Sequence, residues 1–236
     1  MASVRGLAGM NIARFLLMRL KTLRGMTVVH VGAHVGSEAI RYDQLLAKRV
    51  VWIEASPVLF QSLTENIKNL KLETRNRSIF QRFAGNSKTE HICVNALIGE
   101  DDSDEASFHI YDNDGKSNSV FKIDRNNGHY DFLKETGEIL NLPVKTLDGA
   151  LVEAGINPEE VNVLVLDTQG AELLCLKGAT KLLKSASYIE AEVSKEAVYQ
   201  GGVLLRELDA WLAGRGFRRK TIVRRPHMNA IYKKAG

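Results

Sequence analysis

The sequence predicts an α/β fold in which a mostly parallel central sheet is covered by helices on both faces. Short apolar segments alternate with segments of helical periodicity, as they do in strand–helix–strand units. The apolar segments are rich in β-branched residues, which is typical of strands buried on both faces. A glycine-containing turn follows the first of these segments. The strands are expected at residues 27–31, 50–53, 161–166 and 188–193.

A chain of 236 residues with 44% hydrophobic and 25% charged residues is expected to form one globular domain. It holds no run of the roughly 20 apolar residues that a membrane-spanning helix needs. We expect the domain over residues 26–236, after an N-terminal extension at 1–25 in which residues 11–23 form an amphipathic helix. The basic, acid-free start also fits an organelle transit peptide, but the helical pattern favours the first interpretation and a cytoplasmic protein.

The remaining elements follow from apolar periodicity and from end signals. Ser56 as an N-cap and Pro57 at the first helical position predict a helix that ends near Leu70. A closing antiparallel hairpin is expected around Pro226. Further helices are expected at 37–48, 171–184 and 204–212, a further strand at 91–98, and the hairpin strands at 217–223 and 229–233.

Residues 101–146 are expected to be the least regular part of the chain. They begin with an acidic run and contain turn-forming residues at 112–115. This turn differs from a calcium loop, because its glycine falls at the fourth position instead of the sixth. We therefore expect a hairpin turn there.

Both ends of the chain are basic, within a net charge of +4. The C-terminal cations could attract an anionic substrate or nucleic acid. No nucleic-acid motif accompanies them, so we interpret them as solvated charges of the hairpin. Cys93 and Cys175 lie far apart in apolar segments and predict neither a disulfide framework nor a metal site, as in a protein of a reducing compartment.

Glycines and acids follow the predicted strands, where an open parallel sheet binds its ligands. Gly32 and Gly36 follow the first strand, and the missing side chain lets the backbone turn sharply and approach a ligand. Glu54 follows the second strand, where its carboxylate can accept hydrogen bonds from both ribose hydroxyls of an adenosine. Asp167 follows the strand at 161–166.

The first loop distinguishes two classes of adenosine cofactor. Dinucleotide enzymes favour Gly-x-Gly-x-x-Gly, which brings backbone N–H groups to a pyrophosphate. Here the run is Gly-Ala-His-Val-Gly at 32–36, which suits a cofactor without phosphate, S-adenosyl-L-methionine. The residues predicted to bind it are Gly32, Ala33, His34, Gly36, Ser37, Glu54, Ala55, Ala96 and Asp167.

These motifs, in order along one domain, resemble the FkbM-type methyltransferases over most of the chain. The similar segments are 28–36, 53–57 with Asn66, 144–148, 163–172 with 176–179, and 192–194 with Tyr199. The sequence departs from the family at His30, where Asp is usual, and at His34, where a small polar residue is common. The resemblance implies a Rossmann-like class I methyltransferase fold. It also implies methyl transfer from S-adenosyl-L-methionine to a hydroxyl of a sugar, a polyketide or another small molecule.

An alcohol is a poor nucleophile near neutral pH, so a base or a metal must help to remove its proton. Asp167 is the first candidate base, with Gln169 and Glu172 near enough in sequence to orient it, and Glu192 is the second. In the alternative interpretation, Asp167 hydrogen-bonds the amine of the cofactor or caps the following helix. Asp167 and Glu192 could also bind a divalent cation, but their spacing alone does not establish one, and no metal site is assigned.

Residues 101–146 are expected to recognise the acceptor, because loops carry specificity on this scaffold. Within them, Lys116–Ser119 resembles a Ser-containing segment near the cofactor pocket of the family. The isolated histidines His34, His109 and His129 are expected to be neither bases nor metal ligands. Two alternatives stay open: an NAD(P)-dependent oxidoreductase, and a non-catalytic binding module that uses the basic C-terminal face.

Overall fold

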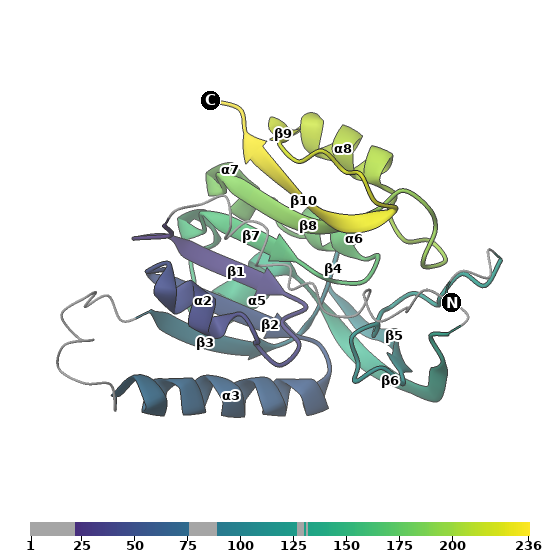
Figure 1. Cartoon of the computed structure of the whole chain (residues 1–236), viewed down its shortest axis with the longest axis horizontal. Helices are drawn as coiled ribbons and strands as arrows, with labels where there is room; N and C mark the ends of the chain where they lie inside the picture. Colours follow the sequence, from purple (N-terminus) through teal and green to yellow (C-terminus); the bar gives the residue numbers. More distant parts are fainter. Residues whose placement is uncertain (1–21, 76–88, 127–129, 131) are drawn as a thin grey trace.

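The computed structural model describes residues 22–75, 89–126, 130 and 132–236. Within them, the strands form a seven-stranded sheet in the order β3-β2-β1-β7-β8-β10-β9 and a three-stranded sheet in the order β4-β6-β5 (Figure 1). In the large sheet β3, β2, β1, β7 and β8 run parallel, and β10 runs antiparallel to β8 and β9. The predicted fold class is confirmed, including the closing antiparallel pair. The strands are β1 (Thr27–Val31), β2 (Arg49–Glu54), β3 (Glu90–Asn95), β4 (Leu97–Gly99), β5 (Ser103–Tyr111), β6 (Glu135–Thr146), β7 (Val163–Leu166), β8 (Tyr188–Ser194), β9 (Phe217–Arg219) and β10 (His227–Lys234).

The strand order changes direction between β1 and β7, near the centre of the large sheet. From β1 the chain adds β2 and β3 on one side, and β7 and β8 are added on the other. Val31 at the end of β1 pairs with Leu166 at the end of β7. Gly32 and Asp167, which follow these two residues, therefore emerge side by side at the switch point where such sheets bind ligands.

Helices cover both faces of the large sheet (Figure 1). In β1, Val29 and Val31 pack into the core cluster under α5, α6, α7 and α8, whereas Val28 packs into the cluster under α2 and α3. This division follows from the alternation of side chains along a strand. The helices are α2 (Ala39–Gln44), α3 (Pro57–Arg75), α5 (Leu147–Glu153), the 3₁₀ helix η1 (Pro158–Glu160), α6 (Glu172–Lys177), α7 (Leu182–Ser185) and α8 (Leu205–Ala213).

The single helix predicted at 171–184 is wrong, because the structure has two helices, α6 and α7, separated at Gly178. A Cβ on Gly178 would lie 2.2 Å from a carbonyl oxygen of β4, so this position accepts only glycine. The side chain of Asp148 then accepts hydrogen bonds from the backbone N–H groups of Lys181 (2.6 Å) and Leu182 (3.0 Å). These bonds cap the start of α7 in place of a residue of α7 itself.

Two expectations about strands need correction. The strand predicted at 91–98 divides at Ala96 into β3 and β4, because β4 leaves the large sheet and pairs with β6. Residues 101–146 are irregular only in part, since β5 and β6 form an antiparallel pair, whereas the described residues of 112–134 between them contain no helix or strand. Both strands begin with exposed and mostly polar residues, and their apolar residues, such as Phe108 and Tyr111 of β5 and Leu140 and Leu142 of β6, are confined to the later part of each strand. The predicted turn at 112–115 is present and brings Ser119 back beside β5.

Other boundaries shift by several residues. Helix α3 runs to Arg75 instead of ending near Leu70, and α2 is shorter than the helix predicted at 37–48. Residues 11–21 of the amphipathic helix predicted at 11–23 lie outside the described residues, and Thr22 and Leu23 are not helical. In the part of the chain that the structure describes, no helix is both long and apolar enough to cross a membrane.

Candidate active site

A cavity opens at the carboxyl edge of the large sheet, between the ends of β1, β2 and β7 and the strands of the small sheet. It combines an apolar wall with a few polar groups that point toward it, as small-molecule sites do. Most of the residues predicted to bind a cofactor meet here. Those that line the cavity are Gly32, His34, Glu54, Ala55, Ala96 and Asp167.

The other predicted cofactor residues lie beside the loop instead of on the cavity. Ala33 is buried in the core cluster under α2 and α3. A Cβ on Gly36 would lie 2.6 Å from Cδ1 of Leu63, so this glycine allows the loop to approach α3. Ser37 is exposed just before α2. These three residues shape the loop and do not face the cavity.

Glu54 joins the loop after β1 to the start of α3. Its Oε2 accepts a hydrogen bond from the backbone N–H of His34 (2.8 Å), and its Oε1 accepts one from that of Ser56 (2.9 Å). Burial raises the pKa of Glu54 to about 7, against the opposing effect of backbone hydrogen bonds from Ser56, His34 and Ala55. Because a carboxylate has about four lone pairs, Glu54 can still accept a further hydrogen bond beside those from the backbone.

The turn after β5 closes another side of the cavity. Nε2 of His34 lies 2.7 Å from the carbonyl oxygen of Asp114, which ties the β1 loop to this turn. Lys116 and Asn118 line the cavity, and Asn118 Oδ1 accepts a hydrogen bond from the backbone N–H of Tyr111 (3.0 Å). The segment Lys116–Ser119 therefore lies where the family resemblance implies.

The sequence did not identify the apolar part of the cavity wall. Two of these side chains lie at the ends of strands of the large sheet and the others belong to the small sheet and the turn after β5, and no local pattern distinguishes them from ordinary core residues. Thr168 and Ala171, which also line the cavity, were recognised only as members of a family motif. The apolar lining consists of Val31, Ile53, Leu97, Ile98, Phe108 and Val120.

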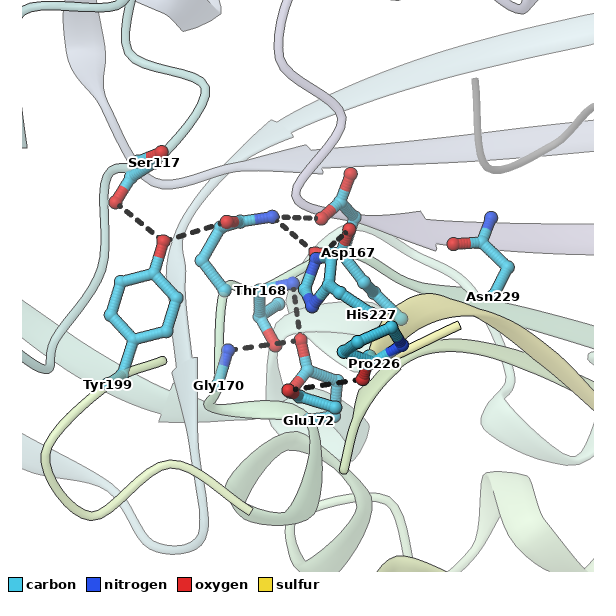
Figure 2. Close-up of polar contacts among 12 residues, drawn as sticks. Ser117, Asp167, Thr168, Gly170, Glu172, Tyr199, Pro226, His227 and Asn229 are labelled. Atoms are coloured by element: carbon cyan, nitrogen blue, oxygen red, sulfur yellow. Dashed lines mark hydrogen bonds and ion pairs between the residues drawn. The ribbon is translucent and has the colours of Figure 1, made fainter. Parts of the chain in front are cut away.

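A hydrogen-bonded network lies behind Asp167 (Figure 2). Nε2 of Gln169 donates to Oδ1 of Asp167 (2.5 Å) and to Oε2 of Glu192 (2.6 Å). The hydroxyl of Tyr199 donates to Oε1 of Gln169 (2.8 Å), which fixes the orientation of the amide. Gln169 has a left-handed backbone, with φ +53°. A non-glycine residue in this conformation costs on the order of 1–3 kcal/mol and persists where its surroundings fix it, often at functional sites.

The two carboxyl groups of the network differ in their charge. Burial raises the pKa of Asp167 well above its ordinary value, and the charge of Glu192 raises it further. The pKa of Glu192 is lowered, because the upward effect of burial is outweighed by the charge and the hydrogen bond of His227, whose Nε2 lies 2.7 Å from Oε1 of Glu192. Burial and the charge of Glu192 thus favour the protonated form of Asp167, whereas His227 favours the ionised form of Glu192.

Glu172 holds the backbone of the 167–170 loop and makes no hydrogen bond to the side chain of Asp167. Its Oε1 accepts hydrogen bonds from the N–H groups of Thr168 (3.0 Å) and Gly170 (3.3 Å), as Figure 2 shows. Burial raises the pKa of Glu172 to about 7. The sequence suggested that both Gln169 and Glu172 orient Asp167. In the structure only Gln169 contacts the side chain of Asp167, and Glu172 instead holds the backbone of the loop.

His30, where the family usually has Asp, is a core residue. Its ring stacks on Trp52 with the centroids 5.4 Å apart, and its Nδ1 lies 3.3 Å from the hydroxyl of Tyr42. Burial lowers the pKa of His30 to about 4, so the ring is neutral. Among the described residues, no group of three or more His, Cys, Asp or Glu side chains is arranged to hold a metal ion.

A parallel sheet of this strand order, with a closing antiparallel strand and a cavity beyond β1, β2 and β7, defines the class I methyltransferase fold. Precorrin-6y C5,15-methyltransferase from Geobacter metallireducens has this fold and matches the chain with a TM-score of 0.50 and 10% identity, covering 100% of this chain and 94% of that one. The methyltransferase FkbM domain model matches residues 30–219. The chain belongs to the FkbM methyltransferase family.

Two further solved structures are similar. Methyltransferase FkbM from Methylobacillus flagellatus has a TM-score of 0.49 and 16% identity, covering 88% of this chain and 43% of that one, so the chain spans less than half of that protein. A putative tRNA (m1A22) methyltransferase from Streptococcus pneumoniae, in complex with S-adenosyl-L-methionine, has a TM-score of 0.45 and 11% identity, covering 94% of this chain and 71% of that one. A search of the curated proteins gave no significant match.

Proposed function

We propose that the protein transfers a methyl group from S-adenosyl-L-methionine to a hydroxyl of a small molecule such as a sugar or a polyketide. The observation that carries this proposal is the position of Glu54. Its buried carboxylate lies on the wall of the cavity, next to the loop after β1, and retains the capacity to accept a hydrogen bond from a ribose hydroxyl. Membership in the FkbM family supports the class of reaction.

The rest of the cavity fits the parts of this cofactor. The apolar wall that includes Ile53, Ile98 and Phe108 suits the adenine ring. Asp167 lies at the other strand end, where its carboxyl can accept hydrogen bonds from the ammonium group of the methionine moiety. Binding of this cation would lower the pKa of Asp167. Acids on the cavity wall also disfavour a pyrophosphate, which supports adenosylmethionine over NAD(P).

In this proposal Gly32, His34, Glu54, Ala55, Ala96 and Asp167 contact the cofactor, and Ala33, Gly36 and Ser37 support the loop. The cofactor supplies an activated methyl group, so the protein has to align the acceptor and remove its proton. Asp167 and Glu192 form the catalytic centre. The turn at 112–117 and the β5–β6 pair, within residues 101–146, form the acceptor-recognition region, supported by Lys116 and Asn118 on the cavity wall.

Calorimetric titration tests the cofactor assignment. S-adenosylhomocysteine should bind the wild-type protein, and NAD should not. A hydrogen bond to a charged group contributes about 1.5–3 kcal/mol, so Glu54→Ala, which removes the acceptor, should weaken binding by up to about 100-fold. Glu54→Gln keeps one carbonyl oxygen and should give an intermediate loss.

Glu65→Ala, at an exposed position of α3, is the matched control and should bind like the wild type. Circular dichroism checks that each variant is folded. Binding of NAD, or full affinity of a folded Glu54→Ala variant for S-adenosylhomocysteine, would contradict the proposal.

A further inference from the structure

We propose that His227, oriented by Glu192, is the base that accepts the proton of the acceptor hydroxyl, and that the acceptor reaches it through a second cavity behind Asp167. This inference rests on the proposed methyl transfer and assigns the proton-accepting role within it. His227 lies at the start of β10, far from the motifs of the sequence, and no spacing pattern marks it.

The first observation is the geometry of the ring. Nε2 of His227 lies 2.7 Å from Oε1 of Glu192, a residue of β8. A carboxylate at this distance accepts the Nε2–H and leaves Nδ1 as the nitrogen with a free lone pair. The same logic orients the histidine of a Ser-His-Asp triad, in which one nitrogen faces a carboxylate and the other faces the reacting hydroxyl.

The second observation is that Nδ1 lacks a partner. It is buried, and no hydrogen-bond partner for it exists within residues 22–75, 89–126, 130 and 132–236. An unsatisfied buried polar atom is rare in a folded protein and calls for an explanation. A hydroxyl of a bound acceptor would supply the missing hydrogen bond.

The third observation is a small cavity beside the ring. His227 lines it together with Glu172, Glu192, Ser194 and Tyr199, and its interior has room for a group about the size of a water molecule, such as the reacting hydroxyl of the acceptor. The 167–170 loop separates the two cavities: Gln169 lines the first cavity, and Gly170 lines the second. In this proposal the acceptor hydroxyl reaches Nδ1 past the Gln169 amide, which the structure holds on Glu192.

The charges around His227 suit this role. Burial acts to lower the pKa of His227, but the charge of Glu192, its hydrogen bond and the charge of Glu172 outweigh burial and raise the pKa above its ordinary value of 6.5. Glu192 faces the ring from β8 and Glu172 from α6, while Asp167 acts on the ring through Glu192. In the proposed complex the carboxyl of Asp167 is occupied by the ammonium group of the cofactor, which leaves His227 to accept the proton of the acceptor. A base is most effective when its pKa lies near the working pH, which favours His227.

The chemical step balances with these groups. The acceptor oxygen forms a bond to the methyl carbon while the carbon–sulfur bond of the cofactor breaks. The electron pair of the broken bond stays on the sulfur. The proton of the hydroxyl moves to Nδ1 of His227. The resulting imidazolium is stabilised by the ionised Glu192.

Histidine NMR tests the tautomer without requiring activity. Long-range ¹H–¹⁵N correlation of labelled protein, with the His227 signal assigned by its absence in His227→Asn, should show a neutral ring protonated at Nε2. The variant Glu192→Gln removes the negative charge that raises the pKa of His227, so the lowering effect of burial should dominate. The pKa of His227 should then fall below about 6.5. A neutral ring protonated at Nδ1, or a pKa that Glu192→Gln leaves unchanged, would overturn the assignment.

Kinetics with an acceptor found by screening test the role itself. His227→Asn should lower kcat by about 100-fold or more and remove the acid limb of the pH profile, while the affinity for S-adenosylhomocysteine changes less than about threefold. Lys233→Gln, at an exposed position of the same strand, is the control and should keep wild-type kcat. Retention of kcat and of the acid limb in His227→Asn would refute the base while leaving methyl transfer intact. Failure of the wild type to bind S-adenosylhomocysteine would instead refute the proposed function.

Discussion

The Cα of Gly32 packs directly against the main chain of Asp167, so closely that a Cβ on Gly32 would lie 1.8 Å from the Asp167 carbonyl oxygen. Gly32 also has φ +77°, in the left-handed region that favours glycine. The first glycine of the loop is therefore required by the contact between β1 and β7, even before a ligand binds.

The variant Gly32→Ala should lose stability both through the left-handed backbone of this residue and through the collision of its new Cβ with the main chain of Asp167. Gly137→Ala is the matched control, because Gly137 also has a left-handed backbone, with φ +84°, but a Cβ at this position would meet no atom within 4 Å. The left-handed strain costs each variant about 1–2 kcal/mol, and the collision should bring the cost for Gly32→Ala to about 4 kcal/mol or more. Urea unfolding measures both. Equal losses would show that the close contact is absent.

Glu172→Gln should change how stability depends on pH. The pKa of Glu172 is raised from 4.5 to about 7, so the folded state binds this proton more tightly than the unfolded state. Its contribution to stability is fully present below pH 4.5 and is lost as the pH rises through 7. Glutamine keeps the oxygen that accepts from Thr168 and Gly170 but does not titrate.

The free energy of unfolding of the wild type should therefore fall by about 2–3 kcal/mol more than that of Glu172→Gln between pH 5 and pH 8. Chemical denaturation across this range measures the difference. Glu65→Gln, an exposed acid of α3, should follow the wild-type curve. Parallel curves for Glu172→Gln and the wild type would mean that Glu172 titrates normally.

Asp148→Ala should destabilise the protein by removing the cap of α7. The carboxylate accepts hydrogen bonds from two backbone N–H groups at the start of this helix. Loss of such a cap costs about 1–2 kcal/mol, which thermal or urea unfolding detects. Asp104→Ala, on the exposed part of β5, should change stability by less than about 0.5 kcal/mol. Similar values for the two variants would contradict the capping role.

Tyr199→Phe should cost about 1–2 kcal/mol, because it leaves the Oε1 of Gln169 without its donor in a buried network. Tyr188→Phe removes a hydroxyl at a half-buried position of β8 and should be nearly neutral. Unfolding measurements compare the two. No loss in Tyr199→Phe would indicate that another group donates to the amide.

The sequence was sufficient for the parallel sheet, since β1, β2, β7 and β8 are short, apolar and rich in β-branched residues. It also placed Gly32, Glu54 and Asp167 at strand ends that meet, because parallel strands carry their carboxyl ends to one edge. The small sheet escaped prediction because β5 and β6 each begin with exposed, mostly polar residues, so their hydrophobic pattern is confined to the later part of each strand.

The part of the site that could not be predicted depends on residues brought together only by the fold. His227 reaches Glu192 because β10 runs antiparallel to β8 and begins where β8 ends. The break in the helix at Gly178 is likewise a tertiary effect, because it depends on contact with β4. Neither relationship has a local sequence signal.

A methyl-transfer screen with labelled S-adenosyl-L-methionine tests the central claim most directly. Sugars, polyketides, peptides and RNA are offered as acceptors, and the products are treated with alkali to separate ethers from esters. The proposed function predicts label in a hydroxylated small molecule, as an alkali-stable methyl ether, and no label with Glu54→Ala. Label in RNA or peptide alone, or in none of the acceptors, would contradict it.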